Sequence, residues 1–417
     1  MHLLSAKIAL AFILVVVLSS CAQRLDGNPS SEPRSSTSVS QAVKLAASDF
    51  SSIKSFDIFV EGDQNLHLLV SGKISGAKNP LVKYFRSLDG GKTWAKPVSV
   101  NAAEVPPTVS RRGSDIQIAA RGNNVVAAWQ VMGEFPGMGP ITLAYSADGG
   151  KSWNRGKSIR NQPTLLDQGY MDLAVDTEGT FHLTWLDDRE ERGDSQALRY
   201  SQSLDGGRTW VGEATLVEKV CTCCWTAMAT SGKEQVDVLY RAIEPRDMVM
   251  VQSPDGGILW EQVSVVGQFG WQFVGCPHAG GAVQTVENNG AIVFHSLVWT
   301  GSQSHKGLYY LQSVDKGRSW TKPRKMDDSH AKLGDIAAKD ASHVAVVWDS
   351  ASEKGIDVFF SSSVDGGRFW KKPRRLTKKE TVAKYPRIAA TSRGYQVFWT
   401  EKAESGQSII TTTLIVD

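Results

Sequence analysis

The chain is poor in the features that mark several large protein classes. Only 5 of its 417 residues are cysteine, and no Cys-x-x-Cys-His string occurs, which argues against covalently attached haem. Beyond residue 20 no apolar stretch is long enough to span a membrane. The net charge is only +3, and the one concentrated basic segment, 371–379, is typical of a solvated edge. We therefore expect a soluble body that binds no nucleic acid.

The first 20 residues are typical of an export signal. Lys7 precedes the apolar run 8–18, which is too short for a membrane span and fits the hydrophobic region of a signal peptide. The run ends in Leu-Ser-Ser-Cys21, which resembles a bacterial lipobox. This resemblance implies cleavage before Cys21 and acylation of that residue, which would anchor the protein in a membrane stably. Ala22 at the next position implies the outer membrane, and an ordinary signal peptide is the alternative.

The composition changes twice after the signal. Residues 21–48 are rich in serine, proline and glutamine and predict a lipidated flexible tether. Residues 49–417 form a body large enough for a substantial core, since 41% of the whole chain is hydrophobic. We expect a cell-envelope lipoprotein whose body lies in the periplasm or at the cell surface.

A short frame, Ser-x-Asp-x-Gly-x-x-Trp, occurs six times at intervals of 50 to 60 residues. Self-similarity at this period predicts repeated supersecondary units, and units of this size are typical of propeller blades. Each copy lies between two β-rich runs, so the frame predicts a hairpin turn in which the Asp accepts backbone N–H groups and the Trp fills the wedge toward the next blade. We expect this structural role, rather than metal or ligand binding, for Asp89, Asp148, Asp205, Asp255, Asp315 and Asp365.

The frame is similar to the Asp box, or BNR repeat, of sialidases and related propellers. The resemblance covers the chain from about residue 50 to its end. In that family the boxes lie at the blade periphery, away from the ligand. The resemblance therefore implies the scaffold and leaves the activity to be argued from a site.

Seven segments have the pattern of a second blade strand: 65–70, 125–129, 181–185, 236–240, 291–295, 344–348 and 395–399. They predict an all-β fold: a single β-propeller of seven four-stranded antiparallel blades with almost no helix. The last unit has no box, so we expect it to lack its own fourth strand. A strand near residues 42–47 would then close the ring and remove the open sheet edge. Six blades plus an extra hairpin, as sialidases have six, is the alternative.

Two segments interrupt the repeat and hold every cysteine except Cys21. The first carries Cys221, Cys223 and Cys224, and the second carries Cys276 and His278. Both precede the innermost strands of consecutive units, so they should approach each other on blades four and five. For an exported chain disulfides are the first expectation, with a bond from the first segment to Cys276.

A metal site is the alternative for these cysteines. No cofactor is required by the sequence, but thiolates together with His278 suit copper(I) or zinc. The pattern Cys-x-Cys-Cys followed by Gly-Cys-Pro resembles a subgroup of bacterial proteins labelled sialidase-like or BNR-repeat proteins.

Charged residues gather after several second strands, where propeller loops surround a central channel. The resemblance to sialidases implies three arginines that hold a sugar carboxylate, a tyrosine nucleophile and an aspartate acid/base. The catalytic candidates at matching places are Arg189, Arg241, Arg246, Asp187 and Tyr240, with Arg387 as a further arginine and Tyr170 as the alternative nucleophile. Ion pairs between blades are the simpler interpretation of the same residues.

Three functions follow from these patterns. The first is an exo-acting glycoside hydrolase on sialic-acid-like sugars, built on a lipid-anchored propeller. The second is a non-catalytic propeller that binds a glycan or a protein on one face. The third is a metal- or redox-linked lipoprotein that uses the cysteine segments.

Overall fold

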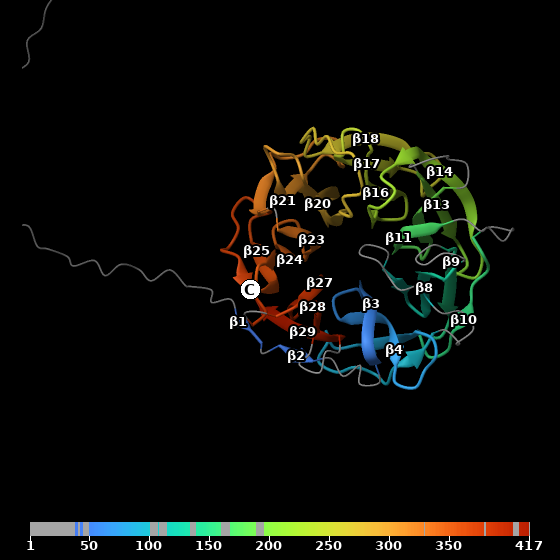
Figure 1. The fold of residues 1–417 in the computed structure, drawn as a ribbon. Helices are drawn as coiled ribbons and strands as arrows, with labels where there is room; N and C mark the ends of the chain where they lie inside the picture. The colour runs from blue at the N-terminus through green and yellow to red at the C-terminus, as the bar shows by residue number, and fades with distance from the viewer. Residues whose placement is uncertain are drawn as a thin grey trace, which may run out of the picture. The chain divides into compact units, whose positions relative to one another are not determined.

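The computed structural model in Figure 1 divides the chain into two units, Met1–Ser36 and Thr37–Asp417. It describes residues 38–40, 42–44, 50–100, 107, 115–133, 139–159, 167–188, 196–328, 330–378, 381–402 and 408–416. The predicted signal peptide and Cys21 lie outside these residues. No helix in the described part of the chain is long and apolar enough to cross a membrane.

The described residues of the second unit form strands and no helix, arranged as seven antiparallel sheets (Figure 1). The innermost strands are β3 (Phe50–Glu61), β7 (Gln117–Arg121), β11 (Gln168–Val175), β15 (Ala227–Ser231), β19 (Gly281–Asn288), β23 (Ala331–Ala338) and β27 (Ala383–Thr391). The second strands are β4 (Asn65–Ile74), β8 (Asn124–Gln130), β12 (Phe181–Asp187), β16 (Gln235–Arg241), β20 (Ala291–Thr300), β24 (Val344–Ser352) and β28 (Gly394–Lys402). All seven predicted second strands are confirmed.

The third and outer strands complete each blade. The third strands are β5 (Leu81–Ser87), β9 (Ile141–Ser146), β13 (Gln196–Ser203), β17 (Met248–Ser253), β21 (Gly307–Ser313), β25 (Gly355–Ser363) and β29 (Ser408–Val416). The outer strands of the first six blades are β6 (Val98–Ser99), β10 (Asn154–Arg155), β14 (Val211–Val220), β18 (Glu261–Val266), β22 (Arg324–Asp327) and β26 (Arg374–Arg375). The fold is thus a seven-bladed β-propeller, and the six-bladed alternative is wrong.

The seventh blade takes its outer edge from the start of the second unit. β1 (Ser38–Val39) and β2 (Val43–Lys44) both pair antiparallel with β29. Val39 lies opposite Ile415, and Val43 lies opposite Thr412. Closure by an N-terminal strand is therefore confirmed, and two short strands inside the segment assigned to the tether provide it.

The hydrophobic core lies between the blades. The buried apolar residues form seven clusters, and each cluster joins residues of two neighbouring blades. One of them packs Phe50 and Leu66 of the first blade against Ala389 and Phe398 of the seventh. Because a core cluster fills this junction as it fills the other six, the ring is closed by packing as well as by strand pairing.

Each Asp box forms the hydrogen-bonded turn that the sequence predicts. In the box of the third blade, Asp205 accepts hydrogen bonds from the Ser203 hydroxyl at 2.9 Å, the Thr209 N–H at 2.9 Å and the Thr209 hydroxyl at 2.6 Å. Burial opposes the charge, but these hydrogen bonds outweigh it and lower the pKa of Asp205. The carboxylate is fully engaged within its own turn, which supports the structural role.

The box tryptophans pack toward the preceding blade and not, as expected, toward the next one. Trp260 of the fourth blade meets Tyr200 of the third edge to face, with ring centroids 4.7 Å apart. The Tyr200 hydroxyl lies 2.7 Å from Nδ1 of the buried His182. The same histidine–tyrosine–tryptophan arrangement recurs at two further junctions, with His67, Tyr84 and Trp153 and with His295, Tyr310 and Trp370.

Candidate functional site

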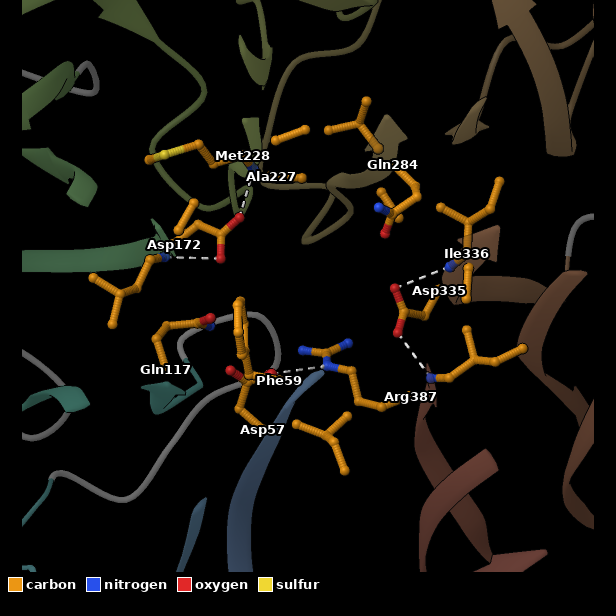
Figure 2. A pocket seen from close by; sticks show the side chains of 18 of the residues that line it. Asp57, Phe59, Gln117, Asp172, Ala227, Met228, Gln284, Asp335, Ile336 and Arg387 are labelled. Carbon is orange, nitrogen blue, oxygen red and sulfur yellow. Dashed lines mark hydrogen bonds and ion pairs between the residues drawn. The ribbon is translucent and has the colours of Figure 1, made fainter. Parts of the chain in front are cut away.

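A pocket of about 430 Å³ occupies the centre of the ring. Residues of all seven innermost strands, or of the loops leading into them, line it (Figure 2). A volume of this size is typical of small-molecule sites. The pocket is therefore the main candidate for ligand binding in the described part of the chain.

Three pocket aspartates each connect one blade to the next. Asp57 accepts the Ile118 N–H at 3.0 Å, Asp172 accepts the Met228 N–H at 2.5 Å, and Asp335 accepts the Ile388 N–H at 2.9 Å. Asp172 and Asp335 also accept the N–H of the residue that follows them, and they face the pocket from opposite sides (Figure 2). A carboxylate offers about four acceptor positions, so each retains capacity for a ligand.

Arg387 is the only cation among the described residues that line the pocket. Its guanidinium lies 3.7 Å from Asp57 and 3.4 Å from Asp115. Asp57 belongs to the first blade and Asp115 precedes the second, whereas Arg387 belongs to the seventh, so these contacts cross the point where the ring closes. Burial opposes the charge of Arg387, but Asp335, Asp115 and the other pocket carboxylates outweigh burial and raise its pKa. Arg387 therefore stays charged. It pairs with two of the four aspartates in the described pocket lining, which are Asp57, Asp115, Asp172 and Asp335.

Burial disfavours the charged form of every group, so it lowers the pKa of an arginine but raises the pKa of an aspartate. It raises the pKa of Asp57 and of Asp172 to about 7, and it also raises the pKa of Asp115 and Asp335. Four carboxyl groups against one guanidinium give the described pocket an excess of acidic groups. Such a lining offers hydrogen-bond acceptors, and donors where a carboxyl is protonated.

Arg241 was predicted to hold a substrate carboxylate, but the structure places it inside the protein. Its guanidinium donates to the carbonyl oxygens of Ala279 at 2.6 Å, Arg246 at 2.5 Å and Trp299 at 2.8 Å. It also lies 5.2 Å from the centre of the Trp271 ring. These contacts connect the fourth blade to the fifth, and Arg241 does not line the central pocket.

The other described candidates also lie outside the pocket lining. Asp187 is buried and accepts from Arg199 Nε at 2.9 Å and from Trp185 Nε1 at 3.0 Å. The Tyr240 hydroxyl donates to Gln262 at 3.0 Å, and Arg246 Nε donates to the Phe273 carbonyl at 3.1 Å. Arg189 lies outside the described residues, so the five candidates are not seen to converge, and their catalytic role stays a prediction.

The sequence contained a signal for the pocket that the candidate list missed. In five blades a polar residue is followed by Ile or Leu at the same place in the innermost strand: Asp57-Ile58, Gln117-Ile118, Asp172-Leu173, Asp335-Ile336 and Arg387-Ile388. Successive side chains of a strand point in opposite directions. All five polar members line the pocket, and the apolar members also belong to core clusters between blades, as Leu173 and Ile336 show. Aligning the repeats on this pair would have identified the lining.

The two cysteine segments meet beside blades four and five, as predicted. Trp225 Nε1 donates to the Gly281 carbonyl at 3.1 Å, and the Thr222 hydroxyl lies 3.9 Å from the Cys276 sulfur. The ligand atoms of Cys221, Cys223 and Cys224 all lie within 4.8 Å of one another, and so do those of Cys223, Cys276 and His278. Cys223 is common to both groups.

All four cysteines of the described part carry free thiols in this structure, with the Cys221 and Cys223 sulfurs 3.7 Å apart. The expected disulfide stays a prediction. Hydrogen bonds from the neighbouring thiols lower the pKa of Cys221, whereas burial raises the pKa of Cys224. The cluster therefore favours one thiolate among hydrogen-bonding thiols.

Comparison with known proteins identifies the repeat. The family model described as a BNR repeat-like domain matches residues 173–397, more than half of the chain. No curated protein matches.

Solved structures share the fold at low identity. An ulvan lyase of polysaccharide lyase family PL25, bound to -[GlcA(1-4)Rha3S]-, has a TM-score of 0.57 and 10% identity, with 89% of this chain and 95% of that chain covered. The Hadza microbial sialidase Hz136 has a TM-score of 0.49 and 16% identity over 74% of this chain and 66% of that one. Trypanosoma rangeli sialidase has a TM-score of 0.49 and 11% identity over 91% of this chain and 59% of its own length.

Proposed function

Because the chain belongs to the BNR repeat-like domain family, we propose that it is a ligand-binding propeller whose central pocket takes a neutral, hydroxyl-rich ligand of the carbohydrate class. One observation carries this proposal. The described pocket lining holds four aspartates against a single arginine, and that arginine is already paired with two of them. A polysaccharide lyase of the same fold, solved with a sugar chain, supports the carbohydrate class; that chain, -[GlcA(1-4)Rha3S]-, carries carboxylate and sulfate groups, so the choice of a neutral ligand rests on the charge of the described pocket lining alone.

The charge of the pocket argues against a sialoside. A sugar carboxylate needs cations with free N–H groups, whereas Asp57 and Asp115 face Arg387, and Asp172 and Asp335 add two further acidic groups. Carboxylates that retain acceptor positions suit the hydroxyl groups of a neutral sugar. We therefore place glycan binding ahead of sialidase activity.

The test compares ligand classes on the full-length protein. We expect binding of neutral oligosaccharides on a glycan array and by calorimetry, and no release of the fluorophore from a fluorogenic α-sialoside. Gln117→Leu and Gln284→Leu should weaken binding, because both side chains belong to the pocket lining. Gln64→Leu, at an exposed position outside that lining, is the matched control and should bind normally.

Three results would overturn the proposal. Binding that the two pocket variants leave unchanged would move the ligand elsewhere on the propeller. Hydrolysis of the sialoside that is lost in Arg387→Met would establish the sialidase function instead. If a pull-down recovers a partner protein and the glycan array shows no binding, the protein-binding alternative is favoured.

Export and lipid anchoring belong to the same proposal. Cys21 would carry the lipid, and the propeller would act in the periplasm or at the cell surface, held by the outer membrane. Membrane fractionation with mass spectrometry of the N-terminal peptide tests this directly. Wild type should be acylated and sediment with membranes, and Cys21→Ser should do neither; an unmodified N-terminus at Ala22 or later would refute the anchor.

A further inference from the structure

We propose that the two cysteine segments form a binding site for a thiophilic cation with a filled d shell, Cu(I) or Zn(II). Cys221, Cys223 and Cys224 are its inner ligands, and Cys276 and His278 are its outer ligands. The site is separate from the central pocket and does not depend on the function proposed for it.

The geometry of the inner sulfurs fits a common metal. A tetrahedral ion with metal–sulfur bonds of about 2.3 Å places its sulfurs about 3.8 Å apart. The Cys221 and Cys223 sulfurs are 3.7 Å apart, and Cys224 lies within 4.8 Å of both. The three sulfurs of this four-residue segment thus already lie near the spacing that binding requires.

The surroundings of the inner sulfurs suit a bound charge. All three cysteines are at most 3% exposed and pack among apolar residues that include Val220 and Met228. The buried guanidinium of Arg241 interacts electrostatically with Cys221 and Cys224. A cation that binds all three sulfurs displaces the protons of the remaining thiols, and its charge compensates the excess negative charge that three buried thiolates beside one arginine would carry.

The outer ligands give the site access from solvent. Cys276 is exposed and His278 is half-buried, and both reach Cys223, which also belongs to the inner group. His278 has a φ of 47°, a left-handed conformation that costs a non-glycine residue free energy. Its backbone is thus held in an uncommon conformation beside Cys223. A shared sulfur would let an ion pass between the exposed and the buried ligands.

Disulfide formation is the competing chemistry for the same thiols. A disulfide needs a sulfur–sulfur distance near about 2.0 Å and removes two thiolate ligands for each bond. Counting free thiols before and after reduction, on full-length protein from the periplasm, shows whether the cysteines are disulfide-bonded or free to bind a metal. The protein is then reduced, loaded anaerobically with Zn(II) alone or Cu(I) alone, and titrated against a competing chelator.

We expect one bound ion per chain, and Co(II) loading should give sulfur-to-metal charge-transfer absorption. Cys223→Ser should lower the affinity by about 100-fold or more, because it removes the shared ligand. Cys276→Ser and His278→Asn should bind with less than about tenfold loss but change the rate of transfer to the chelator. Of Zn(II) and Cu(I), the ion that the chelator removes less readily is identified as the native ion of the site.

The controls address folding and sulfur content. Met228→Leu removes a sulfur that packs against the same cluster but is not one of the five ligands, and His305→Asn removes an exposed histidine elsewhere. Both should bind as wild type. If thermal melting shows that Cys223→Ser is unfolded, Cys224→Ser replaces it, and the Co(II) spectrum of wild type still reports thiolate ligation.

The proposal is wrong if the reduced wild-type protein binds neither ion, or if its Co(II) form lacks sulfur-to-metal absorption. It is also wrong if all four thiols are disulfide-bonded in the exported protein. Metal affinity that Cys223→Ser and Cys224→Ser leave unchanged would place the ion elsewhere.

Discussion

Two adjacent glycines of the fourth Asp box provide a direct test of how the blades pack. Gly256 and Gly257 have φ values of 75° and 97°, so an alanine at either position is strained. A Cβ on Gly256 would meet nothing closer than the Lys233 carbonyl oxygen at 3.5 Å. A Cβ on Gly257 would lie 2.5 Å from Cζ of Tyr200, which belongs to the preceding blade.

The two substitutions should therefore differ in cost. Gly256→Ala carries only the left-handed backbone penalty and should lower the free energy of unfolding by roughly 1–2 kcal/mol. Gly257→Ala carries the same penalty plus an overpacked junction, which adds roughly 1–3 kcal/mol. Tyr200 has little room to move, because its hydroxyl contacts His182 at 2.7 Å and its ring packs on Trp260.

Equilibrium unfolding in urea measures both variants under the same conditions. The excess cost of Gly257→Ala should disappear when Tyr200→Ala is present in both backgrounds, because the clashing ring is then gone. Equal costs for the two glycine variants, or an excess that persists without Tyr200, would refute packing between blades as the reason for the second glycine.

Three further outcomes follow from the same contacts. The pKa of Asp57 and of Asp172 is raised to about 7, so the folded protein retains protons between pH of about 4 and about 7 that the unfolded chain has lost. The free energy of unfolding should therefore fall as pH rises across that window, and Asp172→Asn should make this fall smaller. Urea unfolding at pH 5 and pH 8 measures the difference; a variant that loses as much stability between the two pH values as wild type would contradict the prediction. Arg241→Lys should destabilise the protein by about 3 kcal/mol or more in urea, because one ammonium cannot reach three carbonyl oxygens, and a neutral result would exclude the structural role. Asp205→Ala should lower the urea midpoint without changing glycan affinity in calorimetry, since its carboxylate bonds only within its own turn; lost affinity in a folded variant would give the box a ligand role.

Much of the scaffold was predictable because its determinants are local. Each Asp box is complete within eight residues, so the turn at Ser203–Trp210 could be identified before any long-range contact was known. The absence of a box from the last unit also predicted ring closure, since a unit without its own fourth strand leaves an unpaired strand edge that needs covering. The predicted packing direction of the box tryptophans was wrong, as Trp260 shows, because the twist between blades is a tertiary property.

The candidate site was predictable only in part. The cysteine segments could be placed together because both precede innermost strands of consecutive blades. The arginine candidates could not be sorted, since sequence position does not reveal whether a guanidinium faces solvent, a ligand or backbone carbonyls. Arg241 is occupied by three carbonyl oxygens, and Arg387, at the start of the last blade, lies in the pocket.

The sequence by itself determined the repeated turn, and it favoured seven blades closed by an N-terminal strand over six, because these features depend on short-range patterns that recur with a fixed period. Only the tertiary structure decided the charge of the central pocket and the set of ligands around Cys223. The pocket joins residues far apart in the chain, such as Asp57 and Arg387, whose meeting depends on how the whole ring closes, and the ligand set depends on distances between side chains of two consecutive blades.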